Sequence, residues 1–224
     1  MITKAFILAA GRGERLKPLT NHTPKPMAVV QGKPLIAYHL EQLTEANIKD
    51  VVVNVCWLKE QIITFLKLWP TDNMSIQISD EGSQALETGG GMLKALPLLN
   101  HKPFISINAD VFSDFKLSQL NQLKPNKLVH LLLVKNPDHN PNGDFSFDGE
   151  NLLLKQANDT TYAYSGIGIF HPDLFISEPP NQAFSIVPLI KSAILNKQAT
   201  AQFHEGIWSD VGTLERLDEL NQQQ

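Results

Sequence analysis

The chain has 224 residues, with 19 Lys and Arg, 23 Asp and Glu, and a formal net charge of −4. That balance argues against a nucleic-acid partner, which normally requires a basic excess, and a hydrophobic fraction of 42% excludes a disordered chain. The charge is unevenly distributed: residues 1–33 hold six basic residues and one acidic residue, a net charge of +5, whereas the remainder carries −9. The first hypothesis is therefore an anion-binding site near the N-terminus of an acidic protein.

The cysteine content and the hydropathy indicate in which cellular compartment the protein is expected. Cys56 is the one cysteine, so no disulfide can form within the chain, and a reducing compartment is expected. No stretch approaches the roughly 18–20 apolar residues of a membrane-spanning helix, and the apolar run 5–10 is too short for a signal-peptide core. We expect a cytoplasmic protein with no membrane partner. No oligomeric state is predicted.

Short apolar runs alternate with helical patterns in the first part of the chain. Strands are expected at 5–10, 51–55, 75–79, 104–108 and 130–134, and helices from Pro34, over 58–68 and over 91–99. This alternation predicts right-handed βαβ units on a mostly parallel sheet. Strands of such a sheet are buried on both faces, which explains why their apolar runs are continuous.

The pattern changes after residue 135. A turn-rich segment over 136–143 precedes a hairpin of 144–147 and 152–155 around Asp148-Gly149. Further elements are expected as strands over 165–170 and 199–204 and as helices over 185–195 and from Thr213. We predict an α/β fold, a single domain over residues 1–224 with a Rossmann-like, mostly parallel mixed sheet flanked by helices.

The turn after the first strand is rich in glycine and arginine, with the sequence Gly11-Arg12-Gly13-Glu14-Arg15. Such a turn, at the carboxyl end of a parallel strand, is where α/β proteins bind phosphates. Glycines let backbone N–H groups converge on an anion, and Arg15 can offer a bidentate guanidinium. The spacing matches neither the dinucleotide fingerprint nor a P-loop. An ordinary βα turn with two solvated arginines is the alternative.

Lys25 lies between two prolines, Pro24 and Pro26. Flanking prolines restrict the backbone, so we expect extended geometry at Lys25. A stiff loop that aims one ammonium group is suited to electrostatic stabilisation. The alternative is a surface lysine in a proline-rich turn.

Two aspartates follow predicted strands. Asp110 comes after the strand over 104–108, and Asp210 follows Ile207-Trp208. The fold could bring both to the carboxyl edge of the sheet, where two carboxylates, phosphate oxygens and waters would form a Mg²⁺ site. The alternative for each is a turn or helix-capping aspartate. The histidines show no zinc-type spacing, and the chain offers no candidate for a catalytic nucleophile.

The segment from Leu8 to Leu16, followed by Pro18-Leu-Thr and Pro24-Lys-Pro-Met27, resembles the signature of the sugar-1-phosphate nucleotidyltransferases. Further segments resemble the short uridylyltransferases of that family: Leu86-Glu-Thr-Gly-Gly-Gly91, Asn108-Ala-Asp110-Val, Gly143-Asp144-Phe, Ser165-Gly166-Ile and Trp208-Ser-Asp210-Val-Gly-Thr-Leu-Glu-Arg216. The resemblance covers nearly the whole chain. It implies Mg²⁺-dependent transfer of UMP from UTP to N-acetylmuramate 1-phosphate, with release of pyrophosphate, in cell-wall (peptidoglycan) recycling.

The resemblance also implies roles for individual residues. Residues 1–135 would bind nucleotide and residues 136–224 the sugar phosphate. Nucleotide contacts are expected at Gly11, Gly13, Glu14, Arg15, Lys25, Glu87 and Gly90, with Arg15 and Lys25 catalytic, sugar-phosphate contacts at Asn108, Asp144, Ser165 and Gly166, and Mg²⁺ ligands at Asp110 and Asp210. For Glu87 a solvated loop acid is the alternative, and for Ser165 and Gly166 a strand that needs small residues for packing.

Other readings stay open within and outside the family. Mannose-1-phosphate guanylyltransferase and glucose-1-phosphate thymidylyltransferase are the enzymatic alternatives, and a nucleotide-sensing regulatory subunit on the same fold is the non-enzymatic one. The sequence departs from the family pattern in two places. Ala109 stands where many relatives have glycine, and its methyl group could crowd a ligand. The Glu-Lys-Pro segment of longer thymidylyltransferases is not found after the central strand, and that absence favours the uridylyltransferase type over the glucose-1-phosphate thymidylyltransferases.

Overall fold

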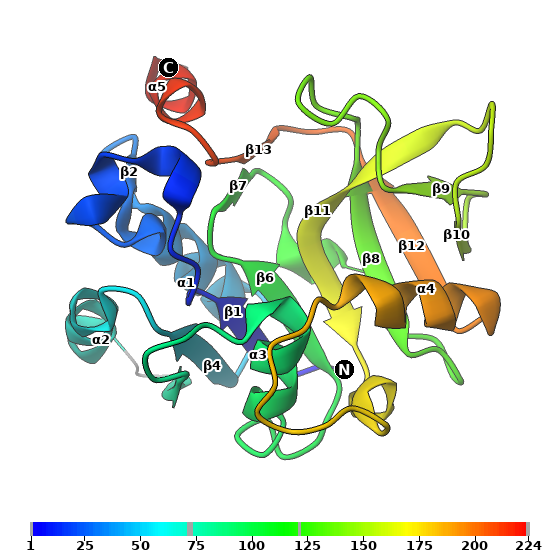
Figure 1. The fold of residues 1–224 in the computed structure, drawn as a ribbon, viewed down its shortest axis with the longest axis horizontal. Coiled ribbons are helices and arrows are strands. Elements are labelled where there is room, and N and C mark those ends of the chain that lie inside the picture. The colour runs from blue at the N-terminus through cyan, green and yellow to red at the C-terminus, as the bar shows by residue number, and fades with distance from the viewer. Residues whose placement is uncertain (1, 71–73, 121, 223–224) are drawn as a thin grey trace.

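The computed structural model describes residues 2–70, 74–120 and 122–222. Its sheet is built around β1 (Lys4–Leu8), which runs parallel to β4 (Asp50–Val55) on one side and to β6 (Phe104–Asn108) on the other (Figure 1). Beyond β4 lies β5 (Ser75–Asp80), also parallel. The carboxyl ends of these strands therefore meet at one edge of the sheet, as the alternating pattern predicts.

The second half of the chain extends the same sheet. β11 (Thr161–Phe170) runs antiparallel to both β6 and β8 (Val129–Val134), and β12 (Ala199–His204) pairs in parallel with β8. β9 (Phe145–Phe147) pairs with the start of β11 and with β10 (Leu152–Leu153), which confirms the predicted hairpin. The described residues thus form one nine-stranded mixed sheet that contains both halves.

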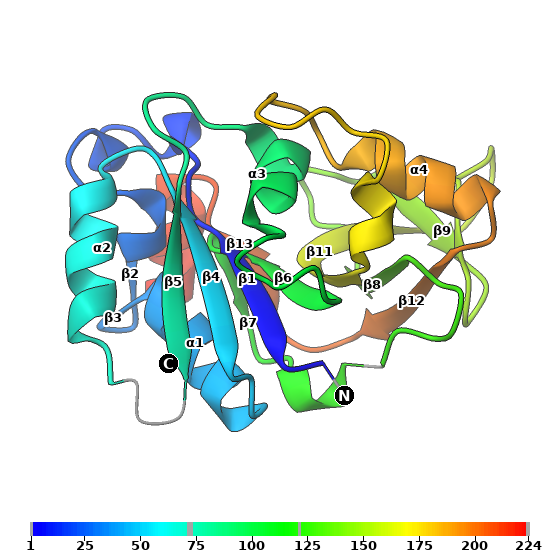
Figure 2. The ribbon, with the colours of Figure 1, turned by 90° about the horizontal axis from the view of Figure 1, so that it is seen from below.

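Helices cover both faces of this sheet. α1 (Leu35–Glu45) and α2 (Lys59–Leu68) pack on one face, and α3 (Glu87–Ala95) and α4 (Val187–Leu195) lie on the other (Figure 2). β1 sends alternate apolar side chains into the two resulting cores, which is the physical reason for its continuous apolar run. The predicted α/β sheet flanked by helices is confirmed.

Short elements complete the chain. β2 (Val29–Val30) pairs with β3 (Lys33–Pro34), and β7 (Val111–Ser113) pairs with β13 (Trp208–Asp210). α5 (Leu214–Gln222) packs near β2 in a third apolar cluster, which also holds Leu16 of the loop after β1. The 3₁₀ helices are η1 (Glu14–Leu16), η2 (Leu19–Asn21), η3 (Lys25–Met27), η4 (Leu117–Gln119) and η5 (Pro172–Phe175). Within the described ranges, no helix has the length and apolarity needed to cross a membrane.

Two elements begin four residues earlier than the sequence predicts. α3 starts at Glu87 instead of 91, because glycines that would weaken an isolated helix are held there by tertiary contacts. β11 starts at Thr161 instead of 165, because its first residues pair with the short strand β9. Its register then shifts between Tyr164 and Gly168, so a bulge divides the strand.

Candidate active site

A cavity of about 380 Å³ opens at the carboxyl edge of the sheet, beyond β1, β4 and β6. This edge is the usual ligand site of open α/β sheets, and the volume suits a small ligand. Many of the residues that the sequence analysis singled out line it: Gly11, Gly13, Glu14, Arg15, Lys25, Glu87, Asn108 and Asp110. Asn54, Glu81 and Gly212 also line it, and no role is predicted for them from the sequence.

The loop after β1 needs glycine at one position and leaves space at another. Gly13 has a φ of +67°, and a Cβ there would stand 2.9 Å from Cγ2 of Thr20, whose hydroxyl donates a 2.9 Å hydrogen bond to the Gly13 carbonyl. At Gly11, by contrast, a Cβ would meet no atom within 4 Å. The tight turn is therefore fixed at Gly13, while Gly11 faces open space that a ligand can occupy.

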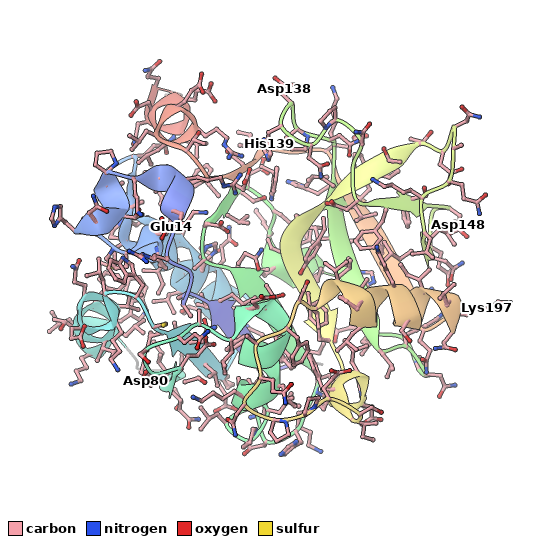
Figure 3. All side chains as sticks on the ribbon, viewed as in Figure 1. Glu14, Asp80, Asp138, His139, Asp148 and Lys197 are labelled. Atoms are coloured by element: carbon pink, nitrogen blue, oxygen red, sulfur yellow. The ribbon has the colours of Figure 1, made fainter. Side chains whose placement is uncertain are left out.

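The two arginines of this loop differ in what they contact. The Arg12 guanidinium lies 4.5 Å from the centre of the Trp57 ring, and its Nε lies 2.9 Å from the Glu14 carboxylate. Lys17 also pairs with Glu14, and this hydrogen bond lowers the pKa of the Glu14 carboxyl. Figure 3 labels Glu14 at the blue N-terminal segment. Arg15 lines the cavity and makes no ion pair with any residue that the structure describes, so its guanidinium can bind an anion.

Lys25 is not extended, contrary to the expectation from its flanking prolines. It begins the 3₁₀ helix η3, in which the Met27 N–H donates to the Pro24 carbonyl at 2.8 Å and the Ala28 N–H to the Lys25 carbonyl at 3.0 Å. Pro26 is tolerated because the first turn of a helix leaves its N–H groups unpaired in any case.

This turn directs the Lys25 ammonium into the cavity, where it forms an ion pair with the carboxylate of Asp110. The two side chains are 13% and 27% exposed.

The pairing of β7 with β13 brings the two aspartates together. Asp210 lies opposite Val111 in this register, and the Val211 N–H donates a 2.8 Å hydrogen bond to the Asp110 carbonyl. Asp210 is therefore part of a short separate sheet and not of the main one. This sheet places residues 100 positions apart in the sequence side by side. Asp110 and Gly212 line the cavity, whereas Asp210 is not among the residues that line it.

Asp210 is held by Arg216, for which the sequence alone predicts no role. The Arg216 guanidinium donates to Oδ1 of Asp210, and Nε2 of His139 lies 3.1 Å from the same oxygen. A Cβ on Gly212 would stand 2.2 Å from the Arg216 guanidinium, so a side chain at this position would require the guanidinium to shift away from Asp210. His139 lies beside β13 in Figure 3. Two features of the sequence point to Arg216 as a candidate site residue: it is one of only three arginines, and it ends the motif that contains Asp210.

Asp110 and Asp210 each keep one carboxylate oxygen that could bind a divalent cation. Oδ1 of Asp110 and Oδ2 of Asp210 accept no hydrogen bond from residues 2–70, 74–120 or 122–222. Those same ranges hold no cluster of three or more His, Cys, Asp or Glu side chains around a possible metal position. Two carboxylates with open coordination positions fit Mg²⁺, which completes its shell with phosphate oxygens and waters.

The glycines at the start of α3 make room for other parts of the chain. A Cβ on Gly89 would stand 2.3 Å from the Phe184 ring, and a Cβ on Gly90 would stand 2.2 Å from the Gln182 carbonyl oxygen. The N–H groups of both glycines point to the Phe184 carbonyl, at 2.9 and 3.3 Å. Gly90, expected as a nucleotide contact, is buried and does not line the cavity. Glu87 does line it and is exposed.

Three of the expected sugar-phosphate residues lie at the bulge of β11 and outside the cavity lining. Oδ2 of Asp144 accepts a 2.8 Å hydrogen bond from the Tyr164 N–H, and the Ser165 carbonyl accepts one of 2.9 Å from the Trp208 indole. Gly166 has a φ of +81°, and a Cβ there would stand 2.8 Å from Nδ2 of Asn108. These residues shape the wall behind Asn108, which is the fourth expected residue and does line the cavity.

Comparison with known proteins gives a consistent result. A family model described as nucleotidyl transferase matches residues 4–224. The N-acetylmuramate α-1-phosphate uridylyltransferase of Neisseria meningitidis serogroup B is 40% identical over 221 residues, 96% of each chain, and that of Caulobacter vibrioides is 32% identical over 93% of this chain and 91% of its own. The structure of UDP-glucose pyrophosphorylase complexed with UDP-glucose has the same fold, with a TM-score of 0.81 at 22% identity over 99% of this chain and 97% of its own. The chain therefore belongs to the nucleotidyl transferase family.

Proposed function

We propose that the protein transfers UMP from UTP to N-acetylmuramate 1-phosphate and releases pyrophosphate. One observation carries the proposal: a glycine-rich turn with Arg15 and the Lys25–Asp110 pair line one cavity on the carboxyl edge of the sheet, and the β7–β13 pairing places Asp210 beside Asp110. The identity of the base and of the sugar rests on the two bacterial relatives, whose names state this activity. We place the reaction in the cytoplasm, as a step of cell-wall recycling.

The reaction that this site can support is an in-line displacement. An oxygen of the sugar phosphate attacks the α-phosphorus of UTP, the new P–O bond forms, and the bond to pyrophosphate breaks. The attacking phosphate is already ionised at pH 7, so neither a general base nor a covalent intermediate is needed. The protein therefore contributes positioning and neutralisation of the crowded negative charge.

Several residues at the cavity have a task in this scheme. The backbone from Gly11 to Gly13 and the Arg15 guanidinium would hold the β- and γ-phosphates, and Lys25 would contact the phosphates at the reacting centre. Residues 136–224 would supply the sugar-phosphate subsite through the wall at the β11 bulge, next to Asn108.

Asp110 and Asp210 would hold Mg²⁺ through their open oxygens. When bound, the ion supplies Lewis-acid polarisation of the phosphates and neutralises part of their charge. Lys25 and Arg216 each pair with one of the two carboxylates and offset its negative charge.

The test is a matrix of substrates. UTP, dTTP, GTP and CTP are each combined with the 1-phosphates of N-acetylmuramate, glucose, mannose and N-acetylglucosamine, and pyrophosphate release is measured. We expect the highest turnover with UTP and N-acetylmuramate 1-phosphate. Faster turnover with GTP and mannose 1-phosphate, or with dTTP and glucose 1-phosphate, would overturn the assignment. Nucleotide binding without pyrophosphate release from any pair would instead identify a nucleotide sensor.

A further inference from the structure

Glu81 is a buried acid at the cavity for which the proposed reaction has no use. It directly follows β5, whose last residue Asp80 is labelled in Figure 3, and it is 7% exposed. Its Oε1 accepts a hydrogen bond from Nδ2 of Asn54 and its Oε2 accepts one from the Leu86 N–H, both at 2.7 Å. Burial raises the pKa of the Glu81 carboxyl, while the two hydrogen bonds act in the opposite direction.

Asn54 continues this chain of hydrogen bonds across the sheet. It lies in β4 and is 2% exposed, and its Oδ1 accepts a hydrogen bond of 2.5 Å from the Ala9 N–H. Ala9 directly follows β1, and Leu86 directly precedes α3. Three hydrogen bonds thus cross the carboxyl ends of β1, β4 and β5 and connect the loop after β1 to the start of α3.

The glycine that ends the Leu86–Gly91 motif fits this arrangement. A Cβ on Gly91 would stand 2.7 Å from Oε1 of Glu81 and 2.9 Å from Nδ2 of Asn54. Because residue 91 is glycine, no side chain obstructs the hydrogen bond between Glu81 and Asn54. Both this helix and the loop after β1 line the same cavity, and they lie at opposite ends of the hydrogen-bond chain.

The polarity of the chain leaves little choice of residues. The N–H groups of Ala9 and Leu86 can only donate, so the two side chains between them must present an acceptor at each end and one donor to each other. One amide and one carboxylate meet this requirement. Loss of a buried hydrogen bond to a charged group is costly, because the group that remains is buried and cannot form a hydrogen bond with water instead.

We infer that Asn54 and Glu81 are positioning residues that hold the loop after β1 and the start of α3 at a fixed separation across the cavity, so that a nucleotide is gripped from both sides. Neither side chain takes part in the displacement. The identity of the nucleotide rests on the proposed function, whereas the link between the two loops rests on the hydrogen bonds alone.

Reversing the polarity of the pair tests the inference. In Glu81→Gln an amide faces two donors, so one hydrogen bond is lost, and in Asn54→Asp two carboxylates face each other. In the double variant, Asp at 54 would accept from the Ala9 N–H and from the new Gln amide, whose oxygen would accept from the Leu86 N–H. All three hydrogen bonds return with the same net charge. Glu60→Gln, which removes one exposed acid from α2, is the control for charge.

Two measurements are made on each variant. We expect each single variant to raise KM for UTP about 10- to 100-fold with little change in kcat, and the double variant to return within about threefold of the wild type. Hydrogen–deuterium exchange of residues 82–88 in the ligand-free protein should be faster in each single variant and restored in the double variant. The second measurement needs no substrate, so it decides the inference even if the proposed reaction fails.

A double variant as impaired as Glu81→Gln in both measurements would overturn the inference, because Glu81 would then act through its charge and not through Asn54. Unchanged KM and unchanged exchange in Glu81→Gln would also overturn it. Restoration of both quantities in the double variant, with Glu60→Gln indistinguishable from the wild type, would establish it.

Discussion

Replacement of Lys25 by methionine separates the contribution of its charge to catalysis from its contribution to stability. The Lys25 ammonium lies in the cavity and pairs with Asp110, and methionine keeps most of the side-chain volume while it removes the charge. We expect a large loss of turnover with a small loss of stability. The assay is pyrophosphate release at saturating UTP and sugar phosphate, alongside thermal unfolding of the ligand-free protein.

The structure provides the magnitudes. The side chains of Lys25 and Asp110 are 13% and 27% exposed, so solvent screens the pair only in part, and removal of Lys25, which leaves the Asp110 carboxylate unpaired, should cost about 1–2 kcal/mol. For a chain of this length that amounts to a fall of about 2–8 °C in Tm. A charge directed at the reacting phosphates contributes about 3–4 kcal/mol to the barrier, so turnover should fall about 10²- to 10³-fold.

Lys4 is a matched control. Its ammonium lies 2.7 Å from the Asp50 carboxylate, and the two side chains are 10% and 35% exposed, close to the values for Lys25 and Asp110. Lys4 begins β1, whereas the cavity lies beyond the carboxyl end of the same strand. Lys4→Met should therefore lower Tm by a similar amount and leave turnover unchanged. Turnover of Lys25→Met within about threefold of the wild type, or an equal loss in Lys4→Met, would refute the reasoning.

Asp110→Asn and Asp210→Asn should each raise the Mg²⁺ concentration needed for half-maximal velocity by about tenfold or more, and an unchanged titration would remove that residue from the metal site. Gly90→Ala should lower stability by about 1–3 kcal/mol, because its Cβ would stand 2.2 Å from the Gln182 carbonyl oxygen; a Tm equal to that of the wild type would show that this contact relaxes freely. Burial lowers the pKa of His39 from 6.5 to about 4, so the unfolded chain binds more protons between these values. Stability present above pH 6.5 should therefore fall by about 3 kcal/mol as the pH approaches 4, and urea unfolding of His39→Leu should lack this component.

Several features of this protein can be predicted from local sequence. The strand expected over 104–108 is observed as β6, Phe104–Asn108, and the helix expected over 58–68 is observed as α2, Lys59–Leu68. Strands buried on both faces must be continuously apolar, and a helix that covers a sheet must repeat its apolar residues every three to four positions. The place of the loop after β1 at the cavity could be predicted for a similar reason, since its glycines and arginines are contiguous and follow a buried strand. Anion binding by this loop stays a prediction.

Other features depend on contacts between distant segments. α3 can begin at Glu87 because Phe184, almost 100 residues later, accepts the N–H groups of two glycines that look unfavourable in isolation. β7 and β13 are too short to show a pattern and exist because they pair with each other. That pairing brings Asp110 next to Asp210.

The same dependence explains why Arg216, Asn54 and Glu81 were given no role from the sequence. Arg216 gains its place only when α5 returns its guanidinium to Asp210. Asn54 and Glu81 become a pair only when β4 and β5 lie side by side. Periodicity and spacing describe how a segment meets the core as a whole, whereas hydrogen bonds and ion pairs at a site depend on which atoms of separate segments come within about 3 Å. That proximity is a property of the assembled sheet.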